Sequence, residues 1–213
     1  MARVKICGVT TEADLQAVVD AGADAVGILT EVDVDTPREV EPDKAADLVA
    51  AAPPFLSTVL VSMPDSAARA VGLAGAVAPD AVQLHGDFGA DEVRYIRREA
   101  RADVITAVDA DDTDRARAHD GVADAILVDS TTESGAGGTG ETHDWEATRS
   151  LADDLETPVV LAGGLTPANV AEAVHTVGPY AVDVSSGVER TGGRKDHEAV
   201  ETFVRNARRE VPV

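Results

Sequence analysis

The sequence predicts an α/β protein with a single (β/α)8 barrel, in which eight parallel strands close into one sheet. The 213-residue chain alternates eight short apolar segments with eight amphipathic ones. The apolar segments are continuous rather than alternating in polarity, which is typical of parallel strands buried on both faces. Strict strand-then-helix repetition that ends on a helix favours a closed barrel over an open doubly wound sheet. No linker divides the chain, so we expect one domain over residues 1–213.

The predicted strands are four to seven residues long and mostly rich in Val, Ile and Leu. In chain order they are 4–7, 25–29, 55–61, 81–84, 104–108, 125–128, 158–161 and 180–184. The predicted helices between and after them often follow an Asp, Thr or Ser, as N-caps require. They are 11–21, 43–52, 65–76, 90–101, 111–119, 145–154, 167–176 and 196–209.

Charge and composition exclude several classes of protein. With 39 acidic and 18 basic residues the net charge is −21, which disfavours nucleic-acid binding. Only three lysines are present, and many acids with few lysines are typical of a halophilic surface, so we interpret the acids as solvated faces. The single cysteine excludes a disulfide framework and a cysteine-based zinc site. Because no apolar run approaches a membrane span and the N-terminus has no signal-peptide pattern, we expect a soluble cytoplasmic protein with no membrane partner.

The catalytic end of such a barrel is where the strands have their carboxyl ends, and three glycine clusters follow strands there. Glycine lets a backbone approach a ligand and point N–H groups at it. The loops after strands 7 and 8 are the usual phosphate site of this fold, and Thr166-Pro167 predicts a helix N-terminus beside them. We therefore predict a phosphate site rather than three ordinary tight turns, formed by Gly138, Gly140, Gly163, Gly164, Ser185, Ser186 and Gly187.

The segment 135–140 also matches G-x-G-x-x-G, the fingerprint of dinucleotide-binding sheets. That fingerprint should open a helix directly after a strand. Here five residues separate Asp129 from Gly135, and Thr142-His143-Asp144 precedes the next helix. The position of the segment relative to the strand and the helix therefore disfavours dinucleotide binding.

Two titratable residues end predicted strands at the barrel mouth. Cys7 ends strand 1 beside Gly8, and Lys5 shares its side of the strand. A lone cysteine is usually a small buried hydrophobe, but a thiol can serve as a base where its surroundings favour the thiolate. Asp129 ends strand 6, where desolvation can keep a carboxyl protonated as an acid. Together they form a candidate proton-transfer pair.

Other candidates have plain structural alternatives. Arg38 lies in an acidic loop and either forms a surface ion pair or clamps a substrate carboxylate. His85 follows strand 4 beside Gly86 and is either a satisfied histidine or a ligand contact. The remaining histidines lack metal-ligand spacing, so we predict no metal.

Short motifs along most of the chain, in this order and spacing, resemble the phosphoribosylanthranilate isomerase family. They are Lys5-Ile6-Cys7-Gly8, 22–27, Pro37-Arg38, 82–86, 128–130, 137–140, Asp144-Trp145, 161–165, 182–189 and 193–196. The chain departs from the family at Ile28-Leu29, Thr36, Glu141 and His143.

The resemblance implies a (β/α)8 barrel of tryptophan biosynthesis that uses neither cofactor nor metal. Its reaction is the Amadori rearrangement of N-(5-phosphoribosyl)anthranilate to 1-(2-carboxyphenylamino)-1-deoxyribulose 5-phosphate. Carried onto this sequence, Cys7 is the general base and Asp129 the general acid. Arg38 lies near the anthranilate, Asp183 is a polar contact to the substrate, and the glycine loops hold the phosphate. The only partner implied is the small phosphorylated substrate. The protein is expected to be a monomer or a homodimer.

Two alternatives remain at this stage. One is another sugar-phosphate barrel isomerase of the histidine-pathway type, which typically has Asp where Cys7 stands. The other is a non-catalytic barrel that binds a phosphorylated ligand. Such a protein would keep the glycine loops but would not need the pair of Cys7 and Asp129.

Overall fold

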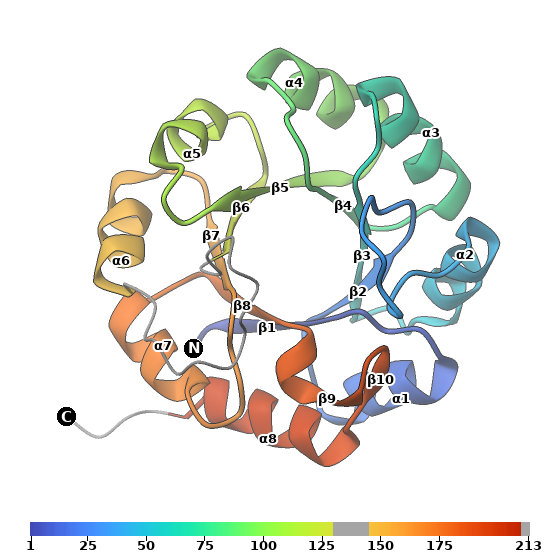
Figure 1. The fold of residues 1–213 in the computed structure, drawn as a ribbon, viewed down its shortest axis with the longest axis vertical. Helices are drawn as coiled ribbons and strands as arrows, with labels where there is room; N and C mark the ends of the chain where they lie inside the picture. The colour runs from blue at the N-terminus through green and yellow to red at the C-terminus, as the bar shows by residue number, and fades with distance from the viewer. Residues whose placement is uncertain (130–144, 210–213) are drawn as a thin grey trace.

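The computed structural model describes residues 1–129 and 145–209, and it forms a closed barrel in the order β1 to β8 (Figure 1). Neighbouring strands are parallel, and β1 pairs with β8 to close the ring. The strands are β1 Arg3–Cys7, β2 Ala25–Leu29, β3 Ser57–Ser62, β4 Ala81–Leu84, β5 Asp103–Asp109, β6 Ala125–Asp129, β7 Val159–Ala162 and β8 Ala181–Val184. The predicted fold class and the order of its elements are therefore confirmed.

Helices surround the ring of strands (Figure 1). They are α1 Glu12–Asp20, α2 Pro42–Ala51, α3 Ala67–Val77, α4 Ala90–Glu99, α5 Thr113–His119, α6 Trp145–Asp154, α7 Val170–Val177 and α8 His197–Ala207. A short 3-10 helix, η1 Ser186–Val188, and an antiparallel hairpin of β9 Glu189–Thr191 and β10 Arg194–Lys195 follow β8. In the described parts of the chain, no helix is long and apolar enough to cross a membrane.

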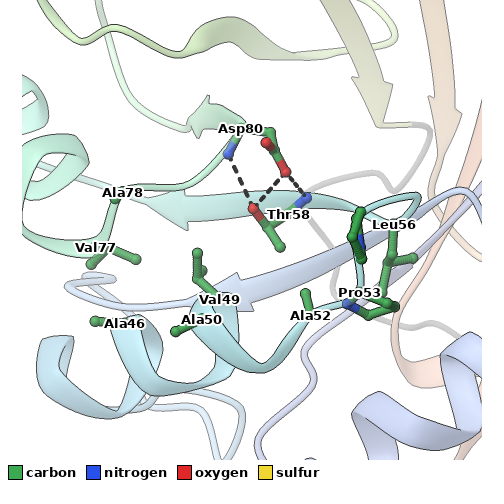
Figure 2. A pocket seen from close by; sticks show the side chains of 11 residues that line it. Ala46, Val49, Ala50, Ala52, Pro53, Leu56, Thr58, Val77, Ala78 and Asp80 are labelled. Atoms are coloured by element: carbon green, nitrogen blue, oxygen red, sulfur yellow. Dashed lines mark hydrogen bonds between the residues drawn. The ribbon is translucent and has the colours of Figure 1, made fainter.

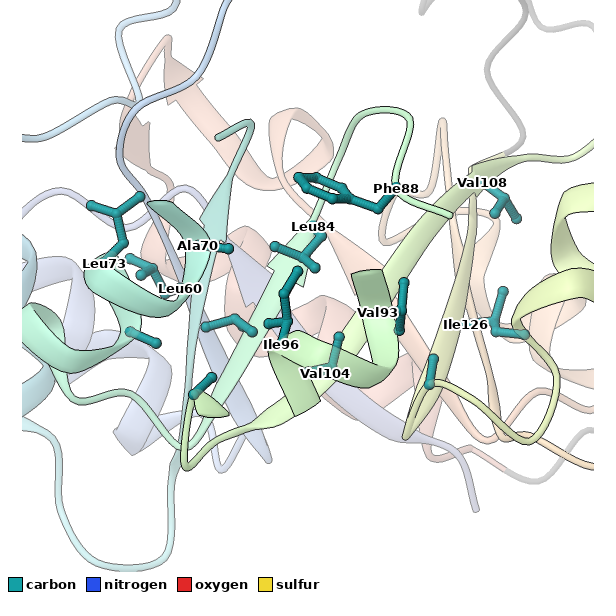
Figure 3. Close-up of a cluster of buried hydrophobic side chains, with 14 of the residues drawn as sticks. Leu60, Ala70, Leu73, Leu84, Phe88, Val93, Ile96, Val104, Val108 and Ile126 are labelled. Atoms are coloured by element: carbon teal, nitrogen blue, oxygen red, sulfur yellow. The ribbon is translucent and has the colours of Figure 1, made fainter. Parts of the chain in front are cut away.

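Strand alternation divides the apolar residues between two sides of the barrel wall. Outward-facing residues such as Leu60, Val104 and Ile126 pack against the helices, as Figure 3 shows around α3 and α4. Inward-facing residues form smaller clusters rich in Ala and Val, such as Val59 and Ala107. Small side chains fill the interior because eight strands leave room for little more.

Three aspartates hold the amino ends of the strands together. Asp24, Asp80 and Asp124 each stand just before a strand and accept a hydrogen bond from the backbone N–H near the start of the preceding strand. The donors are Val4, Thr58 and Val104, at 2.8, 2.8 and 2.9 Å. These three carboxylates satisfy otherwise orphaned backbone donors. The interpretation of the acids as solvated faces is therefore wrong for them.

Two local predictions are also wrong. Helix α7 begins at Val170 rather than at Pro167, because the Asn169 side chain accepts from the Thr166 N–H and donates to the Gly164 carbonyl, closing a turn. Strand β3 begins at Ser57, and Phe55, predicted to lie in it, is fully exposed.

Candidate active site

Strand alternation points Cys7 and Asp129 toward the barrel interior from two separate strands. Cys7 ends β1 and packs with the inward-facing Val59 and Val61. Asp129 ends β6, two residues after the inward-facing Leu127. Cys7 is buried, whereas Asp129 is half-buried at the mouth. The structure therefore brings the two candidate proton-transfer groups to the same end of the barrel.

Two glycines make room around Cys7. Gly27 is its register partner on β2, and a Cβ there would lie 2.7 Å from the Cys7 Sγ and 3.1 Å from the Lys5 Cε. Gly8 has a φ of +77°, and a Cβ there would lie 2.9 Å from both the Arg38 Cδ and the Ser185 Oγ. Both positions therefore require glycine for the side chains beside them to approach one another.

A buried ion pair lies below Cys7 on the inner wall. The Lys5 Nζ donates to the Asp183 Oδ1 at 2.9 Å, and the two side chains are only 5% and 9% exposed. Closure of the barrel sets this pair, because Lys5 on β1 is the register partner of Asp183 on β8. The Oδ1 of Asp183 is thus committed to Lys5.

A second set of charges crosses the mouth from the hairpin after β8. Arg38 donates from Nε and Nη2 to the two oxygens of Glu189, at 2.9 and 2.8 Å. Lys195 donates from Nζ to Glu189 at 2.9 Å and to the Ser185 carbonyl at 3.1 Å, with no side-chain exposure. Of the two interpretations of Arg38, the ion pair exists, but its partner lies across the mouth rather than in the acidic loop.

These contacts leave part of Arg38 available. Its Nη1 also donates to the Thr36 hydroxyl at 3.3 Å. Each terminal nitrogen of the guanidinium keeps one N–H that these three contacts do not use. A substrate carboxylate can accept from N–H groups of this kind.

Burial and charge together set the proton affinities of these groups. Burial raises the pKa of the Cys7 thiol above its ordinary value of 9.0, while the positive charges of Lys5 and Lys195 oppose the rise and Asp183 adds to it. Burial alone would lower the pKa of Lys5, but Asp183 and Cys7 outweigh it and the pKa is raised. Lys5 is therefore held as an ammonium ion beside the thiol.

Glu189 is held as a carboxylate. Burial alone would raise its pKa, but the hydrogen bonds from Arg38 and Lys195 outweigh that effect and lower it. An anionic Glu189 keeps both cations in place.

His85 is partly buried at the end of β4. Its Nε2 lies 2.8 Å from the Gln83 Nε2. Burial, with the charge of Lys5, lowers the His85 pKa, although Asp129 and Asp183 oppose the shift. An amide nitrogen only donates, so the neutral ring accepts at Nε2 and carries its proton on Nδ1.

The glycine loops after β7 and β8 lie against each other. Gly163 and Gly164 have φ values of +91° and +61°, which side chains rarely adopt. A Cβ on Gly187 would lie 1.9 Å from the Leu165 carbonyl oxygen, so η1 packs directly on the loop after β7. Ser185 and Ser186 precede Gly187 in the same loop. Gly138 and Gly140 lie outside the described residues.

A groove at the opposite end of the barrel carries none of this chemistry. It has a volume of about 350 Å³ and lies between the ends of α2 and α3 and the starts of β3 and β4 (Figure 2). Its lining is mostly Ala, Val and Pro, and its carboxylate, Asp80, is hydrogen-bonded to Thr58. Residues 1–129 and 145–209 also hold no group of three or more His, Cys, Asp or Glu placed to bind a metal.

Sequence reasoning assigned no role to Glu189 or Lys195, and it did not foresee the partner of Lys5. Glu189 and Arg38 are 151 residues apart, and Lys5 and Asp183 are 178 apart. No local spacing reports such pairs. The sequence does show that Lys5 and Cys7 are two residues apart on one strand and therefore face the same side. That spacing was the only local indication that Lys5 lies in the site.

The fold and this mouth define a (β/α)8-barrel enzyme in which titratable groups and glycine loops meet at the carboxyl ends of the strands. The family model described as "N-(5'phosphoribosyl)anthranilate (PRA) isomerase" matches residues 4–206. The chain therefore belongs to the phosphoribosylanthranilate isomerase family.

Individual relatives agree with this membership. The chain is 63% identical to the N-(5'-phosphoribosyl)anthranilate isomerase of Halorubrum lacusprofundi, with 99% of both chains covered. It resembles the phosphoribosylanthranilate isomerase structure from Thermotoga maritima with a TM-score of 0.87 and 37% identity, over 97% of this chain and 98% of that one. A structure of such an isomerase in complex with reduced 1-(o-carboxyphenylamino)-1-deoxyribulose 5-phosphate matches with a TM-score of 0.83, 36% identity and the same coverage.

Proposed function

We propose that this enzyme catalyses the Amadori rearrangement of N-(5-phosphoribosyl)anthranilate to 1-(2-carboxyphenylamino)-1-deoxyribulose 5-phosphate in tryptophan biosynthesis. The observation that carries the proposal is the placement of Cys7 and Asp129 at one barrel mouth, facing inward from β1 and β6. The reaction needs one acid and one base on opposite sides of an opening ribose. Positioned proton transfers of this kind contribute roughly 10²–10⁴-fold each.

In the proposed mechanism, Asp129 in its protonated form donates to the ribose ring oxygen. The C1–O bond breaks, and the nitrogen lone pair forms a protonated Schiff base with C1. The Cys7 thiolate then removes the C2 proton, and the electrons of that bond neutralise the nitrogen to give an enolamine. Transfer of a proton to C1 and loss of the enol proton give the ketone.

The proposed substrate contacts follow from the geometry of the mouth. Arg38 offers the unused end of its guanidinium to the anthranilate carboxylate. The proposed contacts to the ribose are His85 and Asp183, the latter through its other oxygen since Oδ1 accepts from Lys5. The proposed phosphate site consists of backbone N–H groups of the loops after β7 and β8, which contain Gly163, Gly164, Ser185, Ser186 and Gly187. The sequence adds Gly138 and Gly140, which lie outside the described residues.

The decisive test is substitution of the proposed acid beside a matched control. Asp129→Asn should reduce kcat by at least two orders of magnitude while the thermal unfolding curve stays within a few degrees of wild type. Asp109→Asn makes the same change at the end of the neighbouring strand, where Asp109 is the register partner of Asp129, and should keep most activity. Loss of phosphoribosylanthranilate fluorescence gives the rate. An active Asp129→Asn enzyme would remove Asp129 from the mechanism.

The base is tested in the same assay. Cys7→Ser should fold normally and lose activity by orders of magnitude, because a hydroxyl is far less acidic than a thiol. Cys7 is the only thiol, so a thiol reagent that inactivates the wild type must act there. Protection by a product analogue would place the thiol in the substrate site, and normal turnover by the labelled enzyme would exclude it as the base.

We also propose that the enzyme is cytoplasmic and acts as a monomer or a homodimer without cofactor or metal. Phe55 is fully exposed, and its chain neighbours Pro54 and Leu56 line the apolar groove, so this is the kind of surface that a second copy covers. Light scattering at several protein concentrations distinguishes the two states. Unchanged activity after dialysis against a chelator is the expected result for the absence of a metal.

A further inference from the structure

Lys5 is a buried cation that the proposed reaction does not use. Its side chain is 5% exposed, on the inner wall of β1 two residues before Cys7. An interior ammonium ion needs a partner, which Asp183 supplies at 2.9 Å. An apolar residue of similar length would fill the same space without burying two charges, and such replacements of buried ion pairs are often neutral or stabilising. The pair therefore needs an explanation beyond stability.

The geometry of Gly27 links this ion pair to the thiol. The ideal Cβ position of Gly27 lies 2.7 Å from the Cys7 Sγ and 3.1 Å from the Lys5 Cε. Both side chains therefore extend over the same glycine and approach each other above it. No other side chain fits between them at that position.

We propose that Lys5, held in place by Asp183, is a positioning residue that stabilises the negative charge of the Cys7 thiolate when it takes the substrate proton. The inference rests on the proposed role of Cys7 as the base. Asp183 keeps Lys5 protonated and holds its Nζ on the inner wall. The Coulomb attraction between the ammonium ion and the sulfur is strong because neither group is in contact with bulk water.

The cations and the carboxylate around Cys7 shift its pKa in opposite directions, and the cations prevail among these charges. The ammonium groups of Lys5 on β1 and Lys195 on β10 lower the Cys7 pKa, against the effect of burial, and Asp183 on β8 raises it less than Lys5 lowers it. Lys195 also donates to Glu189, which accepts from Arg38 as well, and its effect on the Cys7 pKa is smaller than that of Lys5. His85, at the end of β4, is neutral and adds no charge. Lys5 is thus the main favourable charge on the thiolate.

A merely structural ion pair makes a different prediction. If Lys5 only packs the barrel, its replacement changes stability but leaves the ionisation of Cys7 unchanged. Titration of the thiol therefore decides between the two interpretations, and it does not depend on activity.

The experiment uses the full enzyme and four variants. Lys5→Met removes the cation, and Lys5→Met/Asp183→Asn removes both charges so that no unpaired carboxylate stays buried if the single variant fails to fold. Lys44→Met is the matched control, because the Lys44 side chain is 41% exposed and pairs only at 3.9 Å with Glu12 on the outer helices. The thiolate is followed by its ultraviolet absorbance against pH, with Cys7→Ser as the blank. The pH dependence of kcat/KM is measured in parallel.

We expect the Cys7 pKa to rise in the order wild type, double variant, Lys5→Met. Loss of a close opposite charge typically shifts a pKa by about 1–3 units, so Lys5→Met should hold at least roughly tenfold less thiolate at neutral pH. The limb of the kcat/KM pH profile that reports the Cys7 pKa should move to higher pH in the same order, and Lys44→Met should match the wild type. Thiol titrations of Lys5→Met and the double variant that superimpose on the wild type would overturn the proposal.

The two proposals fail in distinguishable ways. An active Cys7→Ser enzyme removes the proposed base, and with it the catalytic meaning of Lys5, even if the thiol titration shifts. An inactive Cys7→Ser enzyme with an unshifted titration in both Lys5 variants leaves Cys7 as the base and rejects Lys5 alone.

Discussion

Gly27→Ala is the sharpest perturbation that the structure offers, because it adds one methyl group between Cys7 and Lys5. The backbone at Gly27 is ordinary strand, so an alanine there is not strained by its φ angle. What opposes it is space. The new Cβ would lie 2.7 Å from the Cys7 Sγ, 3.1 Å from the Cys7 Cα and 3.1 Å from the Lys5 Cε.

The size of the effect follows from these distances. Ordinary contact begins at 3.4 Å, so the sulfur must retreat by about 0.7 Å, the shortfall of 2.7 Å from that limit. A misplacement near 1 Å costs roughly 10²-fold in rate, and overpacking a core costs about 1–3 kcal/mol of stability. We therefore expect kcat/KM to fall by about 10²-fold and the unfolding free energy to fall by roughly 1–3 kcal/mol.

The assay pairs this variant with a control glycine. Gly72 lies on the exposed side of α3, and a Cβ there meets nothing within 4 Å. Gly72→Ala should leave kcat/KM unchanged and stabilise the fold by roughly 0.5–1 kcal/mol, since glycine weakens a helix interior. Urea unfolding and the fluorescence assay are run on both. A Gly27→Ala enzyme with wild-type kcat/KM would show that the position of the sulfur does not limit the reaction.

Four further predictions test charge and protonation. Because burial raises the Cys7 pKa above 9.0, the thiolate absorbance should keep rising with pH between neutrality and that value, and a thiol already fully ionised below pH 7 would contradict the raised pKa. His119 is buried between the Thr106 hydroxyl and the Phe88 carbonyl, and burial lowers its pKa. The stability that its neutral form provides is therefore complete above the unfolded value of about 6.5 and is lost as the pH falls below it, and His119→Gln but not His175→Gln should flatten this loss in urea titrations. With a net charge of −21, the Tm should rise as KCl is added, first by screening within a few tenths of a molar and then by strengthened burial, and flat melts from low to molar salt would reject a halophilic surface. Glu189→Gln should raise KM by roughly tenfold with a smaller change in kcat, because it loosens Arg38, whereas an unchanged KM would mean that Arg38 needs no support from the hairpin.

Most of the fold could be predicted because each strand and each helix has a recognisable local sequence pattern. Strands buried on both faces are continuously apolar, and the eight predicted strands lie within two residues of the observed ones at either end. The start of α7 could not be placed, because Thr166-Pro167 has the composition of a helix start while Asn169 forms hydrogen bonds that close a turn instead. The hairpin of β9 and β10 was not predicted, because its strands are mostly charged and too short to show the alternation of polar and apolar residues that marks a strand.

The mouth was predictable only for residues that end strands. Cys7 and Asp129 follow apolar runs directly, so their place at the carboxyl ends of β1 and β6 follows from the pattern. The partners of Lys5 and Arg38 depend on the closure of the barrel and on the return of the chain after β8. Likewise, the aspartates before β2, β4 and β6 look like surface charges in the sequence, and only the three-dimensional pairing of strands reveals what they accept.

The distribution of lysine separates the needs of the surface from those of the site. The sequence has three lysines among 18 basic residues, and arginine forms most of the ion pairs on the exposed helices. Lys5 and Lys195 are 4% and 3% exposed and both lie at the mouth, where they face Cys7 from β1 and β10. An ammonium group is a compact charge on a flexible stem, so it fits beneath a thiol where a planar guanidinium would need a wider space. Because the surface contains so little lysine, the two buried lysines indicate where the site lies. Lys5→Arg should restore the positive charge lost in Lys5→Met, but its larger side chain should crowd Gly27 and Cys7.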